Sequence, residues 1–205
     1  MELIKLINTY DVVIFDLGGV VIDLEYTATT RAFQELGSEQ FEELYSQALQ
    51  TDLFDRYETG AISSLHFINK LKEFLPRDCS PNQVVAAWNA MIKAFQPEKL
   101  AFLEQLKTTH TIALLSNTND LHEDRVRRSL KKVTERPLED YFHHTFLSHH
   151  LQLRKPHPET FLSVCEKMSV RPEGVLFIDD SIQHIEGAKK AGLATYLFPQ
   201  NAAFH

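Results

Sequence analysis

Residues 11–22 read DVVIFDLGGVVI, a run of apolar and mostly β-branched side chains interrupted by the carboxylate of Asp16. An apolar run of this length that ends in glycines is typical of a buried strand, and Asp16 stands where that strand should stop. Open α/β sheets bind their ligands beyond the carboxyl ends of the strands. Asp16 is therefore a candidate nucleophile or metal ligand, although an Asp before a glycine pair is also typical of a turn that only reverses the chain.

Two later segments repeat this arrangement of a short apolar run with polar residues at its end. The run EGVLFIDD finishes in the adjacent carboxylates Asp179 and Asp180, and the run TIALLS finishes in the hydroxyl of Ser116. Between them, RKPHPETF places Lys155 directly before a proline, which favours an extended backbone at the lysine. These segments make a ligand-binding role for Asp16 the stronger interpretation.

Together these segments resemble the haloacid dehalogenase superfamily of phosphohydrolases, and the resemblance covers most of the chain. The motifs follow the order of that family: Asp16 in FDLGGV, Ser116 in LLSNT, Lys155 in RKPHPE, and Asp179 with Asp180 in FIDDS. Each motif is weak evidence alone, whereas four in order, three of them at strand ends, indicate the family. The resemblance implies an α/β fold with a Rossmann-like, doubly wound parallel sheet and a small all-helical cap.

The resemblance also implies a bound Mg²⁺ ion. By analogy with the family, Asp16 and Asp179 bind the metal directly, Asp180 is a further ligand or supports one, and Gly18 contributes its backbone carbonyl. Hard oxygen ligands suit Mg²⁺, whose charge removes the repulsion between a carboxylate and a phosphate. Asp16 then resembles the family's nucleophile, which attacks phosphorus and forms an aspartyl-phosphate that water later hydrolyses.

The remaining motif residues resemble the family's phosphate-binding and catalytic groups. Phosphoryl transfer gathers negative charge on the equatorial oxygens, so a site needs a cation and hydrogen-bond donors. The resemblance assigns the cation to Lys155, which holds the phosphate and offsets the charge of the nucleophile. It assigns hydrogen bonds to the phosphoryl oxygens to Ser116 and to backbone N–H groups around Gly18 and Gly19, with Asn117 helping to orient those oxygens.

The sequence departs from the family's phosphatases at Gly18. That position usually carries a second Asp, which protonates the leaving oxygen and then activates water, and such acid–base catalysis contributes on the order of 10²–10⁴-fold. Three explanations are open. In the first, the leaving group is an acyl or anomeric oxygen that departs with little protonation. In the second, the proton comes from Asp23, His157 or His184. In the third, the chain binds phosphate without turnover.

Two other classes of function compete with a small-metabolite phosphatase. A catalytically impaired phosphate-binding protein would bind metal and phosphate without turnover that depends on Asp16. A haloacid dehalogenase would use the same nucleophile on carbon, but that reaction needs no divalent metal, and that branch does not keep the carboxylate pair Asp179 and Asp180. Retention of Asp16, Lys155, Asp179 and Asp180 favours an active phosphatase.

The histidine pairs His143–His144 and His149–His150 raise the question of a second metal site. Adjacent residues point to different sides of a strand or helix, and neither pair has a cysteine or carboxylate at ligand spacing. The sequence therefore does not favour zinc at either pair.

Composition narrows the class of protein. The 205 residues carry 43% hydrophobic residues and a net charge of −7, which argues against nucleic acid or an anionic membrane as a partner. The N-terminal segment has no secretory apolar region, no run is long enough to span a bilayer, and the two cysteines form no paired motif. We expect a cytoplasmic protein that binds a small phosphorylated substrate and needs no obligate protein partner.

The distribution of periodic segments predicts two parts, a core from residues 1–23 and 96–205 and a helical cap from residues 24–95. The cap is predicted to contain helices in TTRAFQELG, SEQFEELYSQALQ, SSLHFINKLKEFL and SPNQVVAAWNAMIKAF. Alternating helices and strands follow in the core. The predicted helices there are 97–108, 119–132, 158–168 and 181–191, and the predicted strands are 111–116, 144–148, 175–178 and 194–197.

The cap must read the leaving group, because a phosphate site alone cannot tell one phosphomonoester from another. Loop positions around LFDRYETG, among them Phe54, Arg56 and Tyr57, are the first candidates, together with Glu25 and Tyr26. The aromatic residues there, Phe54 and Tyr57, are also typical of packing between helices, and this second interpretation is the stronger one.

Overall fold

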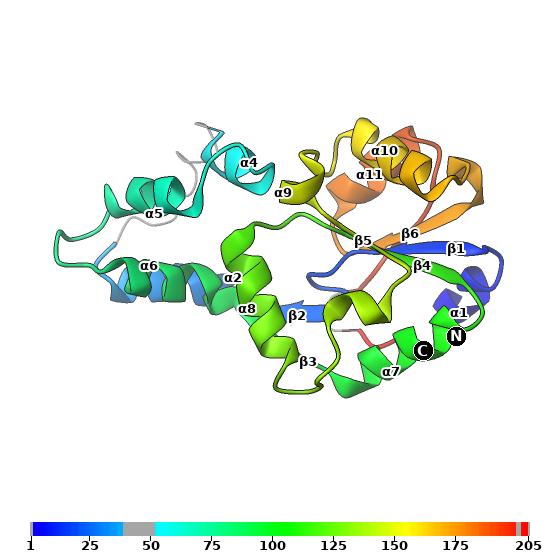
Figure 1. The fold of residues 1–205 in the computed structure, drawn as a ribbon, viewed down its shortest axis with the longest axis horizontal. Helices are drawn as coiled ribbons and strands as arrows, with labels where there is room; N and C mark the ends of the chain where they lie inside the picture. Colours follow the sequence, from blue (N-terminus) through cyan, green and yellow to red (C-terminus); the bar gives the residue numbers. More distant parts are fainter. Residues whose placement is uncertain (1, 39–51, 200–201, 205) are drawn as a thin grey trace.

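A sheet of five parallel strands forms the centre of the computed structural model, which describes residues 2–38, 52–199 and 202–204. The strand order is β5–β4–β1–β6–β7, so the chain winds outward from β1 to one edge and then returns to build the other (Figure 1). This is the doubly wound arrangement predicted from the sequence. The strands are β1 Val12–Phe15, β4 Thr111–Ser116, β5 His144–Leu147, β6 Val175–Asp179 and β7 Ala194–Leu197.

Helices cover both faces of this sheet, because alternate residues of its strands point to opposite sides. Val13 and Phe15 of β1 belong to the apolar cluster formed with α1, α7 and α8, whereas Val12 and Ile14 belong to the cluster formed with α10 and α11. The helices of this part are α1 Glu2–Ile7, α7 Pro97–Lys107, α8 Asp120–Leu130, α9 Ser148–Leu151, α10 Pro158–Met168 and α11 Ile182–Lys190. Short 3-10 turns occupy Leu138–Tyr141 and Pro172–Gly174.

The eight core elements predicted from the sequence are confirmed to within two residues at each end. Asn119 caps α8 as its spacing suggests, since its side chain accepts a hydrogen bond from the backbone N–H of His122 at 3.0 Å. None of the described helices combines the length and the apolar character needed to cross a lipid bilayer.

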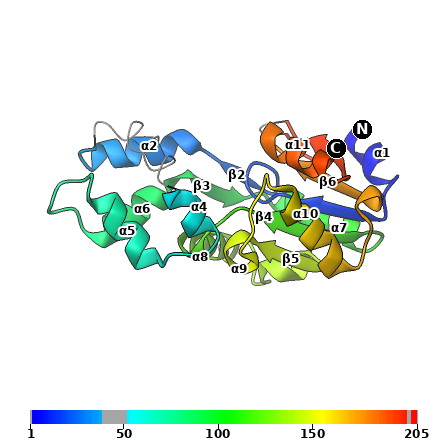
Figure 2. The same cartoon turned by 90° about the horizontal axis from the view of Figure 1, so that it is seen from above.

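Residues 26–38 and 52–88, which we call the helical unit, lie to one side of the sheet (Figures 1 and 2). The described helices of this unit are α2 Tyr26–Glu35, α4 Leu53–Glu58, α5 Ser64–Lys72 and α6 Pro81–Trp88. They pack around their own apolar cluster, in which the ring of Phe54 stacks on Trp88 at a centroid distance of 5.5 Å and Tyr57 stacks on Phe67 at 4.2 Å. The helical unit therefore has a core separate from the two clusters on the sheet.

An antiparallel ribbon joins the helical unit to the sheet, and the sequence did not predict it. Strand β2, Ile22–Leu24, pairs with β3, Ile92–Phe95, whereas we expected one helix through to Phe95. The helix instead ends at Trp88, and a 3-10 turn, Asn89–Met91, follows. Burial explains the difference, because Ile92 and Phe95 pack into a cluster on the sheet while pairing with β2 satisfies their backbone.

Two further predictions for the helical unit need comment. The segment LFDRYETG was treated as a loop, but Leu53–Glu58 forms α4, with Leu53, Phe54 and Tyr57 buried against the other helices. The helix predicted for residues 38–50 falls almost entirely outside the described residues.

Candidate active site

Asp16 and Asp179 end neighbouring strands and face the same buried lysine. Phe15 pairs with Ile178 in the parallel register, so the residues that follow, Asp16 and Asp179, reach the same edge of the sheet. Lys155 Nζ lies 2.6 Å from Asp16 Oδ1 and 2.7 Å from Asp179 Oδ2, and the lysine side chain is 0% exposed. The three sequence motifs therefore meet at one buried point.

The carboxylates around Lys155 outnumber the single ammonium group, so negative charge is in excess here. Burial, together with the carboxylates of Asp179 and Asp180, raises the pKa of Asp16 to about 7, although Lys155 acts in the opposite direction. Burial alone would lower the pKa of Lys155, but the charges of Asp16 and Asp179 outweigh it and raise that pKa. Oxygens of Asp16, Asp179 and Asp180 lie within 4.8 Å of one another. Three carboxylates around one ammonium fit a divalent cation, which would favour ionised Asp16.

Gly19 lets the loop after β1 approach Asp180. Its φ is +75°, and a Cβ atom built there would lie 2.1 Å from Asp180 Oδ2, so only glycine fits. The N–H of Gly19 donates to the carbonyl of Ile22 at 2.8 Å and is therefore already used within the loop. A hydrogen bond from this N–H to phosphate stays a prediction that requires the loop to rearrange.

Gly18 needs no unusual backbone, but its surroundings are filled. A Cβ atom built at Gly18 would lie 2.5 Å from Leu24 Cδ1, the end of a side chain on β2. A side chain at position 18 would therefore require the end of Leu24 to move aside.

Asn117 positions Lys155. Its Nδ2 donates to the carbonyl oxygen of Lys155 at 2.8 Å, and its Oδ1 accepts from the backbone N–H of Lys155 at 2.9 Å. Ser116, 4% exposed, lines the pocket described below, and its Oγ lies 3.4 Å from the carbonyl oxygen of Asn117. The side chain of Asn117 is thus committed to the lysine loop, so an interaction between this side chain and phosphate stays a prediction.

The lysine loop is also held from the other side by α11. A Cβ atom built at Gly187 would lie 2.0 Å from the carbonyl oxygen of Pro156, so the helix approaches the loop more closely than any side chain allows. Sequence analysis did not single out Gly187, since a glycine inside a helix gives no signal of what it contacts.

His184 lies on the first turn of α11 beside Asp179. Its Nδ1 is 3.0 Å from both carboxylate oxygens of Asp179, one of which also accepts from the N–H of Ser181 at 2.8 Å. Burial lowers the pKa of His184 despite the opposing effect of Asp179. Because Lys155 donates to Oδ2 and Ser181 donates to Oδ1, both carboxylate oxygens of Asp179 have partners within the protein.

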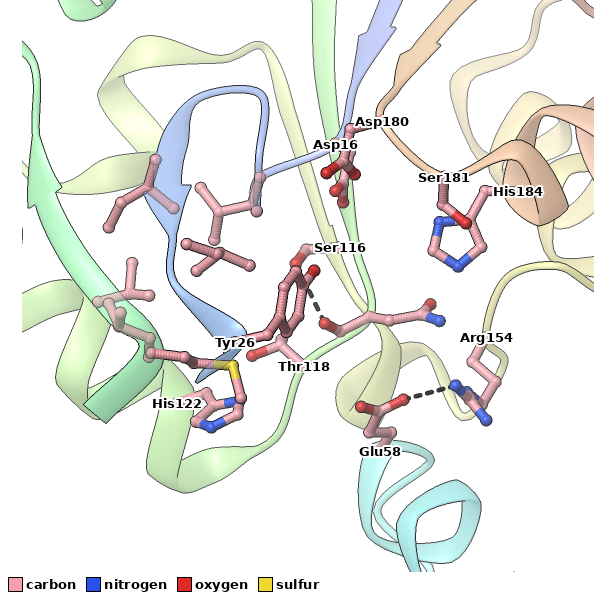
Figure 3. Close-up of a pocket in the computed structure, with 18 of the residues that line it drawn as sticks. Asp16, Tyr26, Glu58, Ser116, Thr118, His122, Arg154, Asp180, Ser181 and His184 are labelled. Atoms are coloured by element: carbon pink, nitrogen blue, oxygen red, sulfur yellow. Dashed lines mark hydrogen bonds and ion pairs between the residues drawn. The ribbon is translucent and has the colours of Figure 1, made fainter. Parts of the chain in front are cut away.

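A pocket of about 270 Å³ opens above Asp16, between the sheet edge and the helical unit (Figure 3). Residues from the sheet side include Asp16, Ser116, Asp180 and His184. The helical unit contributes Tyr26, Phe54, Glu58 and Trp88 to the same pocket. Of the cap positions considered from the sequence, Tyr26 and Phe54 line this pocket, whereas Glu25, Arg56 and Tyr57 do not.

An ion pair joins the two sides of the pocket. Arg154 Nη2 lies 2.9 Å from Glu58 Oε2, and its Nη1 contacts Asp55, so α4 is tied to the residue next to Lys155. Burial raises the pKa of Glu58 to about 7 against the lowering effect of Lys155, and the pairing with Arg154 also favours the carboxylate. Figure 3 shows Glu58 and Arg154 facing each other at the rim.

Glu58 and Arg154 were missed from the sequence. Glu58 carries no sequence signal, because glutamates near the ends of short helices are common on protein surfaces, and only the packing of α4 places it at the pocket. Arg154 had a signal, since it directly precedes the motif residue Lys155. Of the three proton donors proposed for the leaving group, only His184 lines the pocket of Asp16. Asp23 lines a different pocket and pairs with Lys99 at 2.9 Å, and His157 lines a third pocket.

Known proteins resemble this chain along most of its length. It is 29% identical over 191 residues to the D-ribitol-5-phosphate phosphatase of Bacteroides thetaiotaomicron, covering 93% of this chain and 92% of that protein. It is 27% identical over 187 residues to a phosphorylated carbohydrates phosphatase of Thermotoga maritima, covering 89% and 82%.

Solved structures agree with the sequence comparison. A HAD family enzyme from Bacteroides thetaiotaomicron, in complex with magnesium and inorganic phosphate, superposes with a TM-score of 0.87 at 32% identity, covering 95% of this chain and 97% of that one. A HAD-like family hydrolase from Porphyromonas gingivalis gives a TM-score of 0.81 at 28% identity, covering 95% and 93%. The model of the haloacid dehalogenase-like hydrolases matches residues 10–192, and the chain belongs to that family.

Proposed function

We propose that the protein is a Mg²⁺-dependent phosphomonoester hydrolase that acts on a small phosphorylated sugar or sugar alcohol. The observation that carries this proposal is the cluster of Asp16, Lys155, Asp179 and Asp180 at the base of a pocket of about 270 Å³. Relatives named as phosphatases of D-ribitol 5-phosphate and phosphorylated carbohydrates support that class of substrate.

Asp16 is the proposed nucleophile. One of its carboxylate oxygens attacks phosphorus, the bond from phosphorus to the leaving oxygen breaks, and the leaving alcohol takes up a proton. Water then attacks the phosphorus of the aspartyl-phosphate, which releases inorganic phosphate and restores Asp16. Lys155, already 2.6 Å from Asp16 Oδ1, offsets charge on the phosphoryl oxygens, and the hydroxyl of Ser116 donates to them.

Asp16, Asp179, Asp180 and the backbone carbonyl of Gly18 are the proposed ligands of the metal. Magnesium bound there supplies positive charge that stabilises the phosphoryl oxygens. Mg²⁺ is bound by hard oxygen ligands, and the excess of carboxylates over ammonium groups among these residues fits it.

The helical unit is the proposed cap, within the boundaries 24–95 expected from the sequence. Tyr26, Phe54, Glu58 and Trp88 line the side of the pocket that faces away from the sheet edge, where the organic part of a phosphomonoester would lie. This placement supports a role for the helical unit in recognising the leaving group.

Gly18 points to a leaving group of low basicity. Glycine carries no acid at this position, and Leu24 Cδ1 lies 2.5 Å from the place where a Cβ atom would stand. Acid catalysis matters least when the leaving oxygen is a weak base, as in anomeric and acyl phosphates. If no other group, such as His184, supplies the proton, we expect these to be hydrolysed at least about tenfold faster than primary alkyl phosphates, the class to which D-ribitol 5-phosphate belongs.

The deciding experiment is phosphate release from a panel of anomeric, acyl and alkyl phosphates, with Mg²⁺ or with chelator. Asp16→Asn is compared with Asp11→Asn, which removes an exposed carboxylate at the opposite end of β1. Release that needs Mg²⁺ and Asp16 but not Asp11 is the expected result. Turnover in Asp16→Asn contradicts the proposal, and phosphate binding by calorimetry with no turnover in the wild type would favour the phosphate-binding alternative.

The role of Leu24 is tested by restoring the missing acid. Gly18→Asp alone should gain less than the double variant below, because the end of Leu24 must move aside to admit the new side chain. Gly18→Asp combined with Leu24→Ala should raise kcat on alkyl phosphates relative to Leu24→Ala alone, by up to about 10²-fold. No gain in the double variant, with the protein folded by circular dichroism, would show that another group already protonates the leaving oxygen.

A further inference from the structure

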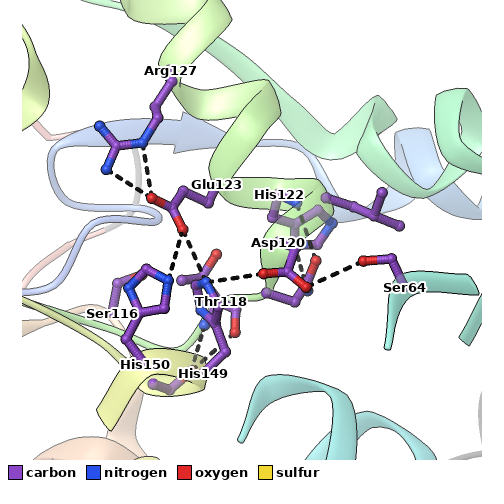
Figure 4. A network of polar contacts seen from close by, with 12 residues as sticks. Ser64, Ser116, Thr118, Asp120, His122, Glu123, Arg127, His149 and His150 are labelled. Atoms are coloured by element: carbon purple, nitrogen blue, oxygen red, sulfur yellow. Dashed lines mark hydrogen bonds and ion pairs between the residues drawn. The ribbon is translucent and has the colours of Figure 1, made fainter. Parts of the chain in front are cut away.

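A second cluster of ligand-type side chains lies outside the pocket, between α8 and α9. Glu123, His149 and His150 place carboxylate and imidazole atoms within 4.8 Å of one another. His149 Nε2 lies 2.9 Å from Glu123 Oε2, and His150 Nε2 lies 3.6 Å from the same oxygen. Figure 4 shows the two rings turned toward Glu123 from α9.

This arrangement reverses the sequence argument against the pair His149–His150. Adjacent residues were expected to point apart, but α9 is a single short turn, and the two ring centroids lie 4.1 Å from each other. The carboxylate that the local sequence lacks comes from α8, twenty-six residues earlier in the chain. The cluster therefore depends on tertiary packing and could not be predicted from the spacing of residues in the sequence.

The distances from Glu123 Oε2 to the two imidazole nitrogens are close to those of a transition-metal site. Zinc binds histidine nitrogen and carboxylate oxygen at about 2.0–2.1 Å in a tetrahedron, which separates ligand atoms by about 3.3 Å. The observed separations of 2.9 and 3.6 Å from Glu123 Oε2 lie on either side of that value. Two imidazoles with one carboxylate suit zinc, cobalt or nickel, whereas magnesium and calcium prefer oxygen ligands alone.

Neighbouring residues hold the carboxylate of Glu123 in place and leave one side of the cluster open to solvent. Arg127 Nε donates to Glu123 Oε1 at 2.8 Å, which fixes the carboxylate and leaves Oε2 for the histidines. The side chain of His149 is 4% exposed and that of Glu123 16%, whereas that of His150 is 63% exposed. A metal ion can therefore enter from solvent on the side of His150.

We propose that Glu123 Oε2, His149 Nε2 and His150 Nε2 form a binding site for a transition-metal dication of the zinc class, with water in the remaining position. The site is separate from the cluster of Asp16, Asp179 and Asp180 and does not depend on the proposed phosphatase activity. His149 Nδ1 has no hydrogen-bond partner among the described residues, so the affinity should fall below that of zinc sites whose histidines are held at both nitrogens.

The site also borders the contact between the sheet and the helical unit. Asp120 Oδ1 lies 3.6 Å from His149 Nε2, while its Oδ2 accepts from Ser64 Oγ of α5 at 3.2 Å (Figure 4). A Cβ atom built at Gly60 would lie 2.6 Å from the carbonyl oxygen of His149, so the turn after α4 rests on α9. A metal that fixes His149 to α8 thus stiffens the surface on which the helical unit rests.

The test uses cobalt as a spectroscopic probe. The full chain is stripped with chelator, given excess Mg²⁺ to occupy the cluster at Asp16, and titrated with Co²⁺ while visible absorption is recorded. His150→Ala is the main variant because this exposed side chain can be removed without disturbing the core, and His144→Ala, an exposed histidine on β5, is the matched control. Glu123→Gln then removes the carboxylate while keeping its shape.

We expect one equivalent of Co²⁺, displaced by Zn²⁺, with tetrahedral-type absorption in the wild type and in His144→Ala. The dissociation constant should rise at least about tenfold in His150→Ala and further in Glu123→Gln. Zn²⁺ should also raise the melting temperature of the wild type but not of His150→Ala. No Co²⁺ binding under excess Mg²⁺, or equal affinity in wild type and His150→Ala, overturns the proposal.

Discussion

The two walls of the pocket differ in how they are built. On the sheet side, Asp16 and Asp179 follow paired positions of neighbouring strands, and Lys155 is gripped by Asn117 and by the close approach of Gly187. On the other side, Glu58 comes from α4, and its described link to the sheet side is the rim ion pair with Arg154. One wall is fixed by backbone pairing, the other by side-chain contacts.

Because the two walls are held differently, substitutions on one wall should affect the reaction and substitutions on the other should affect the choice of substrate. Changes on the sheet wall disturb a buried charge cluster whose members depend on one another, so they should affect every substrate. Changes on the helical wall should alter the preference between substrates and leave the chemistry intact.

The largest effect should follow from Lys155→Met. The variant leaves Asp16 and Asp179 buried without their cation, so activity should fall about 10³-fold and the free energy of unfolding by about 3–5 kcal/mol. Lys99→Met is the matched control, because Lys99 is also buried, at 2% exposed, and pairs with Asp23 at 2.9 Å away from the pocket. Denaturant titration and phosphate release are measured on both. Equal losses of activity would remove the distinction between the two lysines.

The sheet wall is also the part that the sequence predicted well. Asp16, Ser116 and Asp179 end apolar runs, and parallel pairing must bring such ends together, so the sheet and the meeting of these side chains at one edge followed from one-dimensional patterns. The chemical roles of these residues stay predictions. Glu58 could not be predicted, because its place depends on how α4 packs. β3 was missed for a similar reason, since Ile92 and Phe95 fit a helical period equally well until β2 offers pairing.

A smaller effect is expected where α11 meets the lysine loop. Gly187→Ala places a methyl group 2.0 Å from the carbonyl oxygen of Pro156, so the helix or the loop must move, at a cost of about 2–3 kcal/mol in the free energy of unfolding. Activity should fall with it, because the loop carries Lys155. Gly174→Ala is the control, since a Cβ atom there meets nothing within 4 Å. Unchanged kcat in a destabilised Gly187→Ala would show that the loop does not transmit the shift.

On the helical wall, Glu58→Gln should change substrate preference. The variant keeps the size of the side chain but removes its charge and weakens the link to Arg154, so kcat/KM for a preferred sugar phosphate should fall about tenfold. Acetyl phosphate has only an acetyl group to place in the pocket, so we expect it to be hydrolysed at the wild-type rate. Asp55→Asn provides the comparison, because Asp55 also contacts Arg154 but does not line the pocket of Asp16. An equal fall for both substrates would assign Glu58 to the chemistry instead.

The smallest effect concerns His122, which joins the two walls. Its ring stacks on Trp88 at a centroid distance of 4.8 Å, and its Nε2 lies 3.2 Å from the carbonyl oxygen of Trp88, which can only accept. Its Nδ1 lies 3.3 Å from Asn119 Nδ2, which can only donate. These partners require the neutral ring with hydrogen on Nε2, and burial lowers the pKa of His122 to about 4.

Because the folded protein holds this histidine neutral, the unfolded chain binds the proton more readily. The stabilisation is complete above the unfolded pKa of 6.5 and is lost as the pH falls toward 4. After allowance for partial exposure, about 1 kcal/mol should disappear between pH 7 and pH 5.5. Asp16 and Glu58 also titrate near this range, so the contribution of His122 is taken as the difference between the wild type and a variant. Denaturant titration in the presence of chelator should show that the free energy of unfolding falls by about 1 kcal/mol less between pH 7 and pH 5.5 in His122→Gln than in the wild type. Identical slopes would mean that His122 is protonated in the folded state and that the helical unit tolerates its charge.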